Sequence, residues 1–497
     1  MTVLSVTVFF PLVAALVLAI PRLGDTVARW WWVAASLVEV ILVVRLWSGY
    51  RTPAPGGLAY EQRVAWMPGV NSSYHVGLDG LSLPLVAMTS VVFLACSVYA
   101  LRDADRPRSR AALFLGLETV CLGVFAAADL LVFFVFFDLS IVGMYFVIAG
   151  WGHGERQRSA LRFFLYTFLG SLALLAGFIG LYLAASPHTF DIVALVKQNP
   201  LAGHGTLGAV VLGAILLGLA VKTPTVPFHT WLPPAHTDAP TIGSAVLAGV
   251  LLKLGAYGFV RIAMPMLPSA WRAWAWVVIV VGIVSVLVGA LVALAQGNLK
   301  RMIAYTSVNH MGYVVLAVGA AGVLASNTAQ ARAVAVSGAV TQMVSHGLIT
   351  SALFLLAGLF LERTGSYEIS EYGGLATRAP RTTALFAVAA FAALGLPGLS
   401  GFIAEFQIFT GGIGAAPVTA IALLGILVIS AALLWTLQRL FTGELRGRAR
   451  AFTDVRAHEG IAIGLLLVLS LGIGVAPRPV LDVIEPAAHA VIGLVDR

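Results

Sequence analysis

Two lysines that lie inside apolar runs are the first candidates for chemistry. Lys222 ends one run and is followed by Pro224 and Pro227, whereas Lys253 stands near the middle of the next run, which we expect to form an otherwise regular helix. A charged side chain at the bilayer centre costs roughly 2.5–3.5 kcal/mol, so an intramembrane lysine indicates a functional site. Prolines interrupt helical hydrogen bonding, and broken helices persist at membrane depth only beside protein or a water-filled cavity. The segment 220–261 therefore predicts a hydrated ion path.

Acids and histidines stand at a similar depth in other apolar runs. An acid close to a lysine keeps both groups charged, and separating the two lets the lysine release its proton. Histidine exchanges protons near neutral pH, and about one or two bridging waters are enough to connect neighbouring groups. The chain therefore predicts proton transfer through a row of ionisable groups near the middle of the membrane: Glu39, Glu118, Asp138, Lys222, Lys253, His310, His346 and Glu405.

A structural role is the alternative for each of these groups. His310 and His346 fit satisfied core positions, because neutral imidazole is far cheaper to bury than a charge. A single histidine pair without a cysteine attachment motif is weak support for a haem. Glu118 is open between a modulating charge and a local ion pair. For Glu39 we expect a peripheral position at lipid depth, paired with Arg45 or with a neighbouring subunit, and we assign it no mechanism.

The composition excludes a soluble globular protein. Hydrophobic residues make up 60% of the chain and charged residues 10%, and the mean hydropathy is +0.95. These values are typical of a polytopic membrane protein. Of the 30 Lys and Arg residues only four are lysines, so charges that face water are mostly arginines. Because a desolvated lysine can lose its proton and arginine cannot, this division suits proton handling.

Neither cysteines nor short motifs predict a cofactor on this chain. Cys96 and Cys121 stand alone in apolar runs, which excludes a disulfide framework, a zinc site and a cysteine-ligated iron–sulfur cluster. No phosphate-binding glycine loop, nucleophile elbow or nucleic-acid patch is present. We therefore expect redox chemistry to lie in other chains and expect no nucleic-acid partner.

The apolar runs predict an all-α polytopic membrane protein with about 14 transmembrane helices, each near 20 residues. Most Lys and Arg, including Lys300 and Arg301, fall in the connections on one side, and we interpret them as orientation signals that place both termini outside the cytoplasm. Pro233, Pro234 and His236 are expected only to shape a turn. The predicted spans are 2–20, 29–47, 78–101, 111–127, 129–149, 161–183, 207–229, 240–264, 271–296, 302–320, 334–361, 382–411, 417–441 and 459–476.

The chain reads as one membrane domain, 1–497, with an internal repeat. The break at Pro224 and Pro227 in the seventh span is matched by the GLPGLSG segment, 395–401, in the twelfth. Spans 4–8 and spans 9–13 form two five-helix sets, and each break falls in the fourth helix of its set. Because five is odd, the second set enters from the opposite side of the membrane. This predicts inverted repeats at about 111–264 and 271–441, flanked by helices within 1–101 and by 459–476.

Several of these segments together resemble the antiporter-like subunits shared by respiratory complex I, Mrp-type Na⁺/H⁺ antiporters and membrane-bound hydrogenases. The resemblance covers most of the chain and is highly specific. Glu405 stands where the sister L-type and N-type subunits of complex I usually carry lysine, so the resemblance is to the M type. The matching segments are Gly77 to Leu85, Ala128 to Asp138, Ala220 to Arg261, Asn298 to Tyr313, Val344 to Gly358 and Leu394 to Phe406.

The resemblance implies a role for each site residue. It implies a cytoplasmic half-channel with an Asp138–Lys222 pair, a connecting site at Lys253, a polar axis through two histidines, His310 and His346, and an exit group at Glu405. It further implies L-type and N-type partner subunits in a bacterial inner membrane, with flavin, iron–sulfur clusters and quinone in other chains. Asp138 departs from the usual glutamate and lacks the proline that follows it, and Pro234 replaces a common acid.

Three alternatives to a complex I subunit remain. The first is a cation/proton antiporter subunit of the Mrp type, and the second is a membrane subunit of a hydrogenase-type complex. The third is a membrane anchor that has lost transport, against which the joint presence of Lys222, Lys253 and Glu405 argues. Neighbouring genes for cluster-binding and quinone-site subunits would distinguish complex I from the Mrp type.

Overall fold

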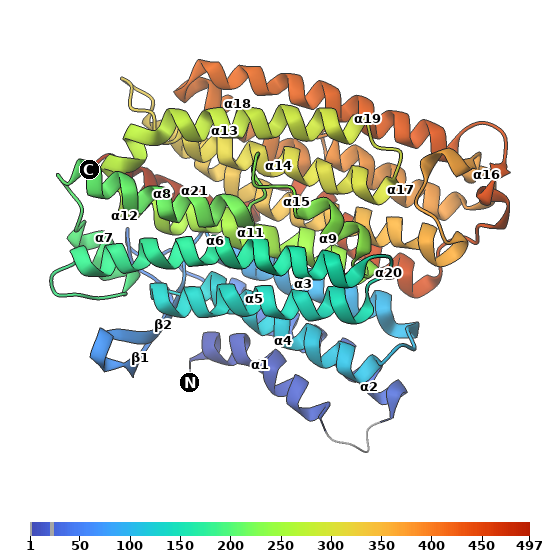
Figure 1. The fold of residues 1–497 in the computed structure, drawn as a ribbon, viewed down its shortest axis with the longest axis horizontal. Coiled ribbons are helices and arrows are strands. Elements are labelled where there is room, and N and C mark those ends of the chain that lie inside the picture. Colours follow the sequence, from blue (N-terminus) through green and yellow to red (C-terminus); the bar gives the residue numbers. More distant parts are fainter. Residues whose placement is uncertain (1, 20–23) are drawn as a thin grey trace.

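Long helices that lie side by side build the protein, as the computed structural model shows for residues 2–19 and 24–497 (Figure 1). Among the described residues, helices occupy at least part of each predicted apolar range, and the number of about 14 transmembrane helices stays a prediction. In the described part of the chain, eleven helices are long and apolar enough to cross a membrane. Among the long helices, α3 (Leu83–Tyr99) and α4 (Pro107–Ala126) are mostly buried. The outer helices are α1 (Val3–Val17), α2 (Asp25–Ser48), α5 (Leu130–Trp151), α6 (Arg156–Ala184), α8 (Gly205–Lys222), α13 (Pro268–Leu294), α19 (Leu423–Phe441) and α20 (Ala457–Val475).

Local sequence explains where several helices begin. Asp129 caps α5 by accepting hydrogen bonds from the backbone N–H groups of Leu131 and Val132, and Asn298 caps α14 (Leu299–Ala320) in the same way. Proline stands in the first turn of α3, α4 and α13, where its missing N–H costs nothing. These caps fix the starts of helices whose interiors are held by apolar packing.

Both predicted helix breaks are confirmed. Helix α8 ends at Lys222, and after an irregular segment the chain continues in the short α9 (Leu232–Asp238). The second break separates α17 (Pro380–Ala393) from α18 (Ser400–Ala415). The symmetry that would relate the two halves as inverted repeats stays a prediction.

The expectation of a regular helix around Lys253 is wrong. Span 241–266 alternates between α-helical pieces and two π-helical turns, Leu247–Leu251 and Phe259–Ala263. The α-helical pieces are α10 (Thr241–Val246), α11 (Leu252–Gly258) and α12 (Met264–Met266). A π-helical turn shifts backbone carbonyls out of the usual pairing and often marks a functional site. The irregularity begins just before Lys253.

Three helical segments lie at the core, and α14, nearly all of whose residues are buried, is one of them. Residues 241–266 and α15 (Ala329–Thr364) are each 94% buried over their most apolar stretch, against 33% for α19 and α20. Apolar side chains such as Leu169, Leu427 and Val468 are exposed on the outer helices, as expected for surfaces that meet lipid or neighbouring subunits. Polar groups on these core segments are therefore shielded by the ring of outer helices.

Two small two-stranded sheets, which the all-α expectation omitted, occupy opposite ends of the bundle. At one end, which we call the hairpin end, β1 (Ala59–Met67) and β2 (Ser72–Leu78) pair antiparallel, with Arg63 opposite His75. Asn71 makes the turn possible with a left-handed φ of 50°. At the other end, which we call the basic end after Arg446 and Arg378, β3 (Tyr372–Gly373) pairs with β4 (Arg446–Gly447), near α16 (Leu375–Arg378) (Figure 1).

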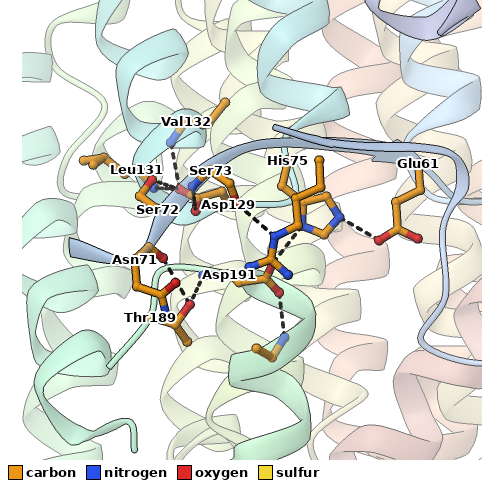
Figure 2. A network of polar contacts seen from close by, with 12 residues as sticks. Glu61, Asn71, Ser72, Ser73, His75, Asp129, Leu131, Val132, Thr189 and Asp191 are labelled. Carbon is orange, nitrogen blue, oxygen red and sulfur yellow. Dashed lines mark hydrogen bonds and ion pairs between the residues drawn. The ribbon is translucent and has the colours of Figure 1, made fainter. Parts of the chain in front are cut away.

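The hairpin is fastened to the helices by a network of charges (Figure 2). His75 on β2 lies between two acids: its Nδ1 is 2.8 Å from Asp191 and its Nε2 is 2.8 Å from Glu61. Asp191 also caps the short helix α7 (Ile192–Gln198) by accepting from the N–H of Ala194. The C-terminal helix α21 (Arg478–Val495) lies at this same end of the bundle (Figure 1).

Candidate functional site

The centre of the site is a direct contact between Lys253 and His346. Lys253 donates to Nδ1 of His346 at 2.5 Å and to the backbone oxygen of Ala248, also at 2.5 Å. Ala248 belongs to the π-helical turn, so the irregular backbone supplies the acceptor. Both side chains are almost fully buried, at 0% and 2% exposure. The pair is therefore shielded from bulk solvent.

Two glycines permit this contact. A Cβ on Gly249 would lie 2.1 Å from Oγ of Ser351, and a Cβ on Gly347 would lie 2.0 Å from Sδ of Met88 and 2.9 Å from the backbone oxygen of Gly249. Real Cβ atoms do not approach that closely. The span that carries Lys253 and helix α15 can therefore approach only because both positions lack a side chain.

The row of titratable groups continues from His346 to Glu405. The ring centroids of His346 and His310 are 5.3 Å apart, and Nε2 of His310 is 3.9 Å from Oε1 of Glu405. A cavity of about 10 Å³ lies among these side chains, lined also by Gln342 and Ser345, which is room for about one water. A proton can therefore pass along this row through short steps.

The second helix break positions Glu405. The carboxyl lies against Gly395, which has a left-handed φ of +69°, and a Cβ there would be 2.5 Å from Oε2 of Glu405. A glycine is thus required both for the backbone conformation and for the space. The irregular segment 394–399, which forms the break, thus packs against the carboxyl group of Glu405, and the exposure of Glu405 is 7%.

Lys222 occupies a separate pocket of its own on α8. Its ammonium donates to Oγ of Ser140 at 3.0 Å and lies over the rings of Phe137, at 5.0 Å, and Phe163, at 5.9 Å. Lys222 is 1% exposed. A hydroxyl and two aromatic faces thus surround the charge.

The ion pair expected between Asp138 and Lys222 is not formed: in the described structure no nitrogen–oxygen contact of 4.0 Å or less joins these two residues. Asp138 is one methylene shorter than glutamate and stays on the partly exposed face of α5, where Ser171 is its hydrogen-bonding neighbour. The carboxylate acts on the ammonium through space, so the pairing is weaker than a contact ion pair.

Lys222 and Lys253 are not joined by a direct contact in the described residues either. Gly255 on α11 faces Lys222, and a Cβ there would lie 2.9 Å from Cβ of Lys222. The two helices are therefore close, but the ammonium groups point to different partners, Ser140 and His346. Transfer between the two lysines requires water or a side-chain movement.

Two further buried groups, Lys300 and His236, were not predicted as site residues. Lys300 in the first turn of α14 is fully buried, donates to the backbone oxygen of Ala239 at 2.6 Å and lies 5.3 Å from the ring centre of Tyr367. His236 on α9 is fully buried and stacks on Phe354 at 4.4 Å, and neither ring nitrogen has a partner among the described residues.

His236 lies within electrostatic range of both Lys300 and Lys253, so it extends the row toward the basic end. The expectation that it only shapes a turn, and that Lys300 only orients the chain, overlooked one sequence signal. Only four residues of the chain are lysines, and three of them, Lys222, Lys253 and Lys300, are buried. Because lysine is scarce in this chain, Lys222 and Lys253 were predicted as site residues, and the same reasoning applies to Lys300.

Comparisons with known proteins identify relatives over the full chain. A model of the family described as NADH:quinone oxidoreductase/Mrp antiporter, TM, matches residues 127–431. NADH-quinone oxidoreductase subunit M of Rickettsia prowazekii is 35% identical over 491 residues, covering 97% of this chain and 96% of the relative. F(420)H(2) dehydrogenase subunit M of Methanosarcina mazei is 36% identical over 500 residues, covering 99% and 98%.

Among solved structures, respiratory complex I from Thermus thermophilus with bound NADH contains a similar chain. It superposes with a TM-score of 0.89 at 30% sequence identity, and the match covers 99% of both chains. The similarity therefore includes the outer helices, the hairpin and both helix breaks.

Proposed function

This chain belongs to the NADH:quinone oxidoreductase/Mrp antiporter transmembrane family, and from this membership we propose that it is a proton-translocating, antiporter-like membrane subunit of NADH:quinone oxidoreductase. The observation that carries the proposal is the buried row formed by Lys253, His346, His310 and Glu405. Buried ionisable groups are costly in a membrane, and a row of them within transfer distance has a physical reason only if protons move along it.

Each residue of the row has a distinct task. Lys253 and His346 hold one proton between them, because two positive charges 2.5 Å apart in a dry interior repel strongly. A second cation approaching from the side of Lys222 displaces that proton toward His310. Glu405 accepts it and releases it through the irregular segment 394–399, while Asp138 modulates Lys222 by stabilising its charged form.

Proton uptake at the basic end has two routes to Lys253. The expected route runs through Asp138 and Lys222 and needs water to reach Lys253. The other runs through Lys300 and His236, which lie on the basic-end side of Lys253, and His236 interacts electrostatically with both lysines. Both routes converge on the Lys253–His346 contact, so that contact controls passage.

The proposal assigns the energy source and the cofactors to other chains. Quinone reduction in other subunits supplies the driving force, and this chain binds no flavin, iron–sulfur cluster or quinone. Its partners are other membrane subunits of the complex, of the L and N types, and the lipid bilayer. The protein lies in a bacterial inner membrane as a multi-pass subunit with the hairpin end, and therefore both termini, outside the cytoplasm.

A second candidate differs in the electron-input module. The Methanosarcina mazei relative is a subunit of F(420)H(2) dehydrogenase, and its identity to this chain equals that of the NADH-linked relative within one percentage point. The same proton row would serve either complex. A Mrp-type cation/proton antiporter or a hydrogenase-type complex is a further alternative, and sodium-dependent proton movement without electron transfer would favour the antiporter.

Proton pumping measured against quinone reduction tests the proposal. The complex, reconstituted in vesicles, is supplied with its native electron donor, and protons moved per electron are compared for wild type, Lys253→Ala and Glu405→Ala. The exposed Lys197→Ala variant is the matched control. We expect fewer protons per electron in the two buried variants and an unchanged ratio in the control. An unchanged ratio in all variants would remove this row from the proton path.

A further inference from the structure

Helices α2 and α4 bring two glutamates together, away from the row described above. The rings of Trp32 on α2 and Phe114 on α4 pack with centroids 5.3 Å apart, which sets the register of the two helices. Glu39 lies two turns beyond Trp32, and Glu118 lies one turn beyond Phe114. The two carboxyl groups lie within electrostatic range of each other.

Both carboxyl groups are fully buried without a partner. Glu39 and Glu118 are each 0% exposed, and none of their four oxygens has a hydrogen-bond donor among the described residues. The hydroxyl of Ser36, one turn before Glu39 on the same face of α2, is likewise buried and unpaired in the described structure. The expected pairing of Glu39 with Arg45 is not formed, because Arg45 is exposed and makes no ion pair with it in the described structure.

Within the part of the chain that the structure describes, neither acid forms an ion pair with a cation. Helix α3 contributes the thiol of Cys96, α4 contributes that of Cys121, and α1 contributes no charged residue in Val3–Val17. An ionised carboxylate without a partner in such a place is so costly that the group takes up a proton instead. Two carboxylates in range of each other make double ionisation costlier still.

Cys121 links this place to the candidate site. It lies one turn beyond Glu118, and its thiol is within electrostatic range of both Glu118 and Lys222. Cys121 is therefore a neighbour of both Glu118 and Lys222, and a negative charge on Glu118 would favour a positive charge on Lys222.

We propose that Glu39 and Glu118 form a proton-binding carboxyl pair on the flank of Lys222. The pair holds at least one proton, and its deprotonation favours the charged form of Lys222. The proton-binding part stands on burial and missing partners alone, whereas the action on Lys222 rests on the proposed function.

Infrared difference spectroscopy of the whole complex tests the proton-binding part, because a protonated carboxyl and a carboxylate absorb at different frequencies. We expect a protonated-carboxyl band in wild type that weakens in Glu39→Gln and in Glu118→Gln. In the double variant, the contributions of both carboxyl groups to this band should be absent. The matched control is Glu459→Gln, which removes a similarly buried glutamate whose carboxyl group accepts hydrogen bonds from Arg363 at 2.6 Å. Bands that are unchanged in both single variants, or a wild-type band that sodium removes at constant pH, would overturn the pair as a proton site.

Proton pumping as a function of pH tests the action on Lys222. In the double glutamine variant, no carboxylate can form to stabilise the ammonium, so we expect pumping to decline at lower pH than in wild type on the alkaline side. A superimposable pumping profile would overturn the coupling to Lys222. The Lys222→Ala variant separates the two proposals: if it pumps normally, the uptake route through Lys222 fails, but its carboxyl band still reports whether the pair holds a proton.

Discussion

Lys253 donates its ammonium to Nδ1 of His346 at 2.5 Å, and no carboxylate among the described residues contacts either side chain. Lysine and histidine therefore share a site where one positive charge is stabilised and two are not. Nε2 of His346 has no partner in the described structure. The ring of His310, the next group of the row, lies beside the ring of His346. This contact is where the proposed uptake routes and the release route meet.

Replacing Lys253 by arginine tests whether the group must release its proton. Arginine keeps the positive charge but does not lose a proton in a protein. We expect Lys253→Arg to abolish the pumping that depends on this chain, while electron transfer to quinone by the rest of the complex continues. Protons moved per electron are the readout, and Lys197→Arg on the surface is the control. Normal pumping in Lys253→Arg would show that this site acts only through its charge.

Adding a methyl group at Gly249 tests the close helix approach. The new Cβ would meet Ser351 at 2.1 Å, so the segment 241–266 and α15 must separate, and we expect Gly249→Ala to lower stability by about 1–3 kcal/mol. Gly464→Ala on α20 is the control, because nothing lies within 4 Å of its Cβ position and alanine favours a helix by about 1 kcal/mol over glycine. Thermal unfolding of the purified complex measures both. Equal unfolding temperatures would contradict the required contact.

Neutralising His236 tests the second uptake route. Glutamine preserves much of the shape of the side chain but cannot carry a proton, so we expect His236→Gln to lower protons per electron, with about half of the pumping that depends on this chain lost if the routes carry similar flux. The exposed His489→Gln variant is the control. Combining His236→Gln with Lys222→Ala should lower pumping further than either change alone. A double variant no worse than Lys222→Ala would show that only one route operates.

The charge network of the hairpin predicts how stability there depends on pH (Figure 2). Burial alone would lower the pKa of His75, but its hydrogen bonds and Coulomb interactions with Asp191 and Glu61 outweigh burial and raise the pKa above 6.5. The contribution of His75 is therefore complete below pH 6.5 and is lost as the pH rises through the raised pKa.

Asp191 limits the same network on the acid side. Burial opposes its ionisation, but hydrogen bonds from His75 and Ala194 and the charges of His75 and Arg63 lower its pKa below 3.8. Its contribution is complete above pH 3.8 and is lost as the pH falls through the lowered pKa. We expect amide exchange in β2 to be slowest between these limits. Asp191→Asn should cost about 1–3 kcal/mol locally, and the exposed Asp482→Asn is the control.

The sequence by itself determined which segments are helical and where two of them break. Hydropathy and proline act locally, so runs of apolar residues specify helices, and Pro224, Pro227 and the segment 395–401 specify interruptions, whatever packs around them. The burial of Lys222, Lys253 and Glu405 followed from the same local pattern, because an ionisable residue inside an apolar run is held at membrane depth by the helix that carries it. The hairpin was not predicted, because its strands lie between the apolar runs.

Only the tertiary structure decided which of these groups meet. The contact of Lys253 with His346 depends on Gly249 and Gly347 facing one another across residues distant in the chain, and no local pattern encodes that pairing. Packing likewise gave Lys222 the hydroxyl of Ser140 in place of Asp138, and buried Lys300 and His236 beside Lys253. Helix formation is governed by neighbours along the chain, whereas proton transfer is governed by distances between helices, which close packing sets.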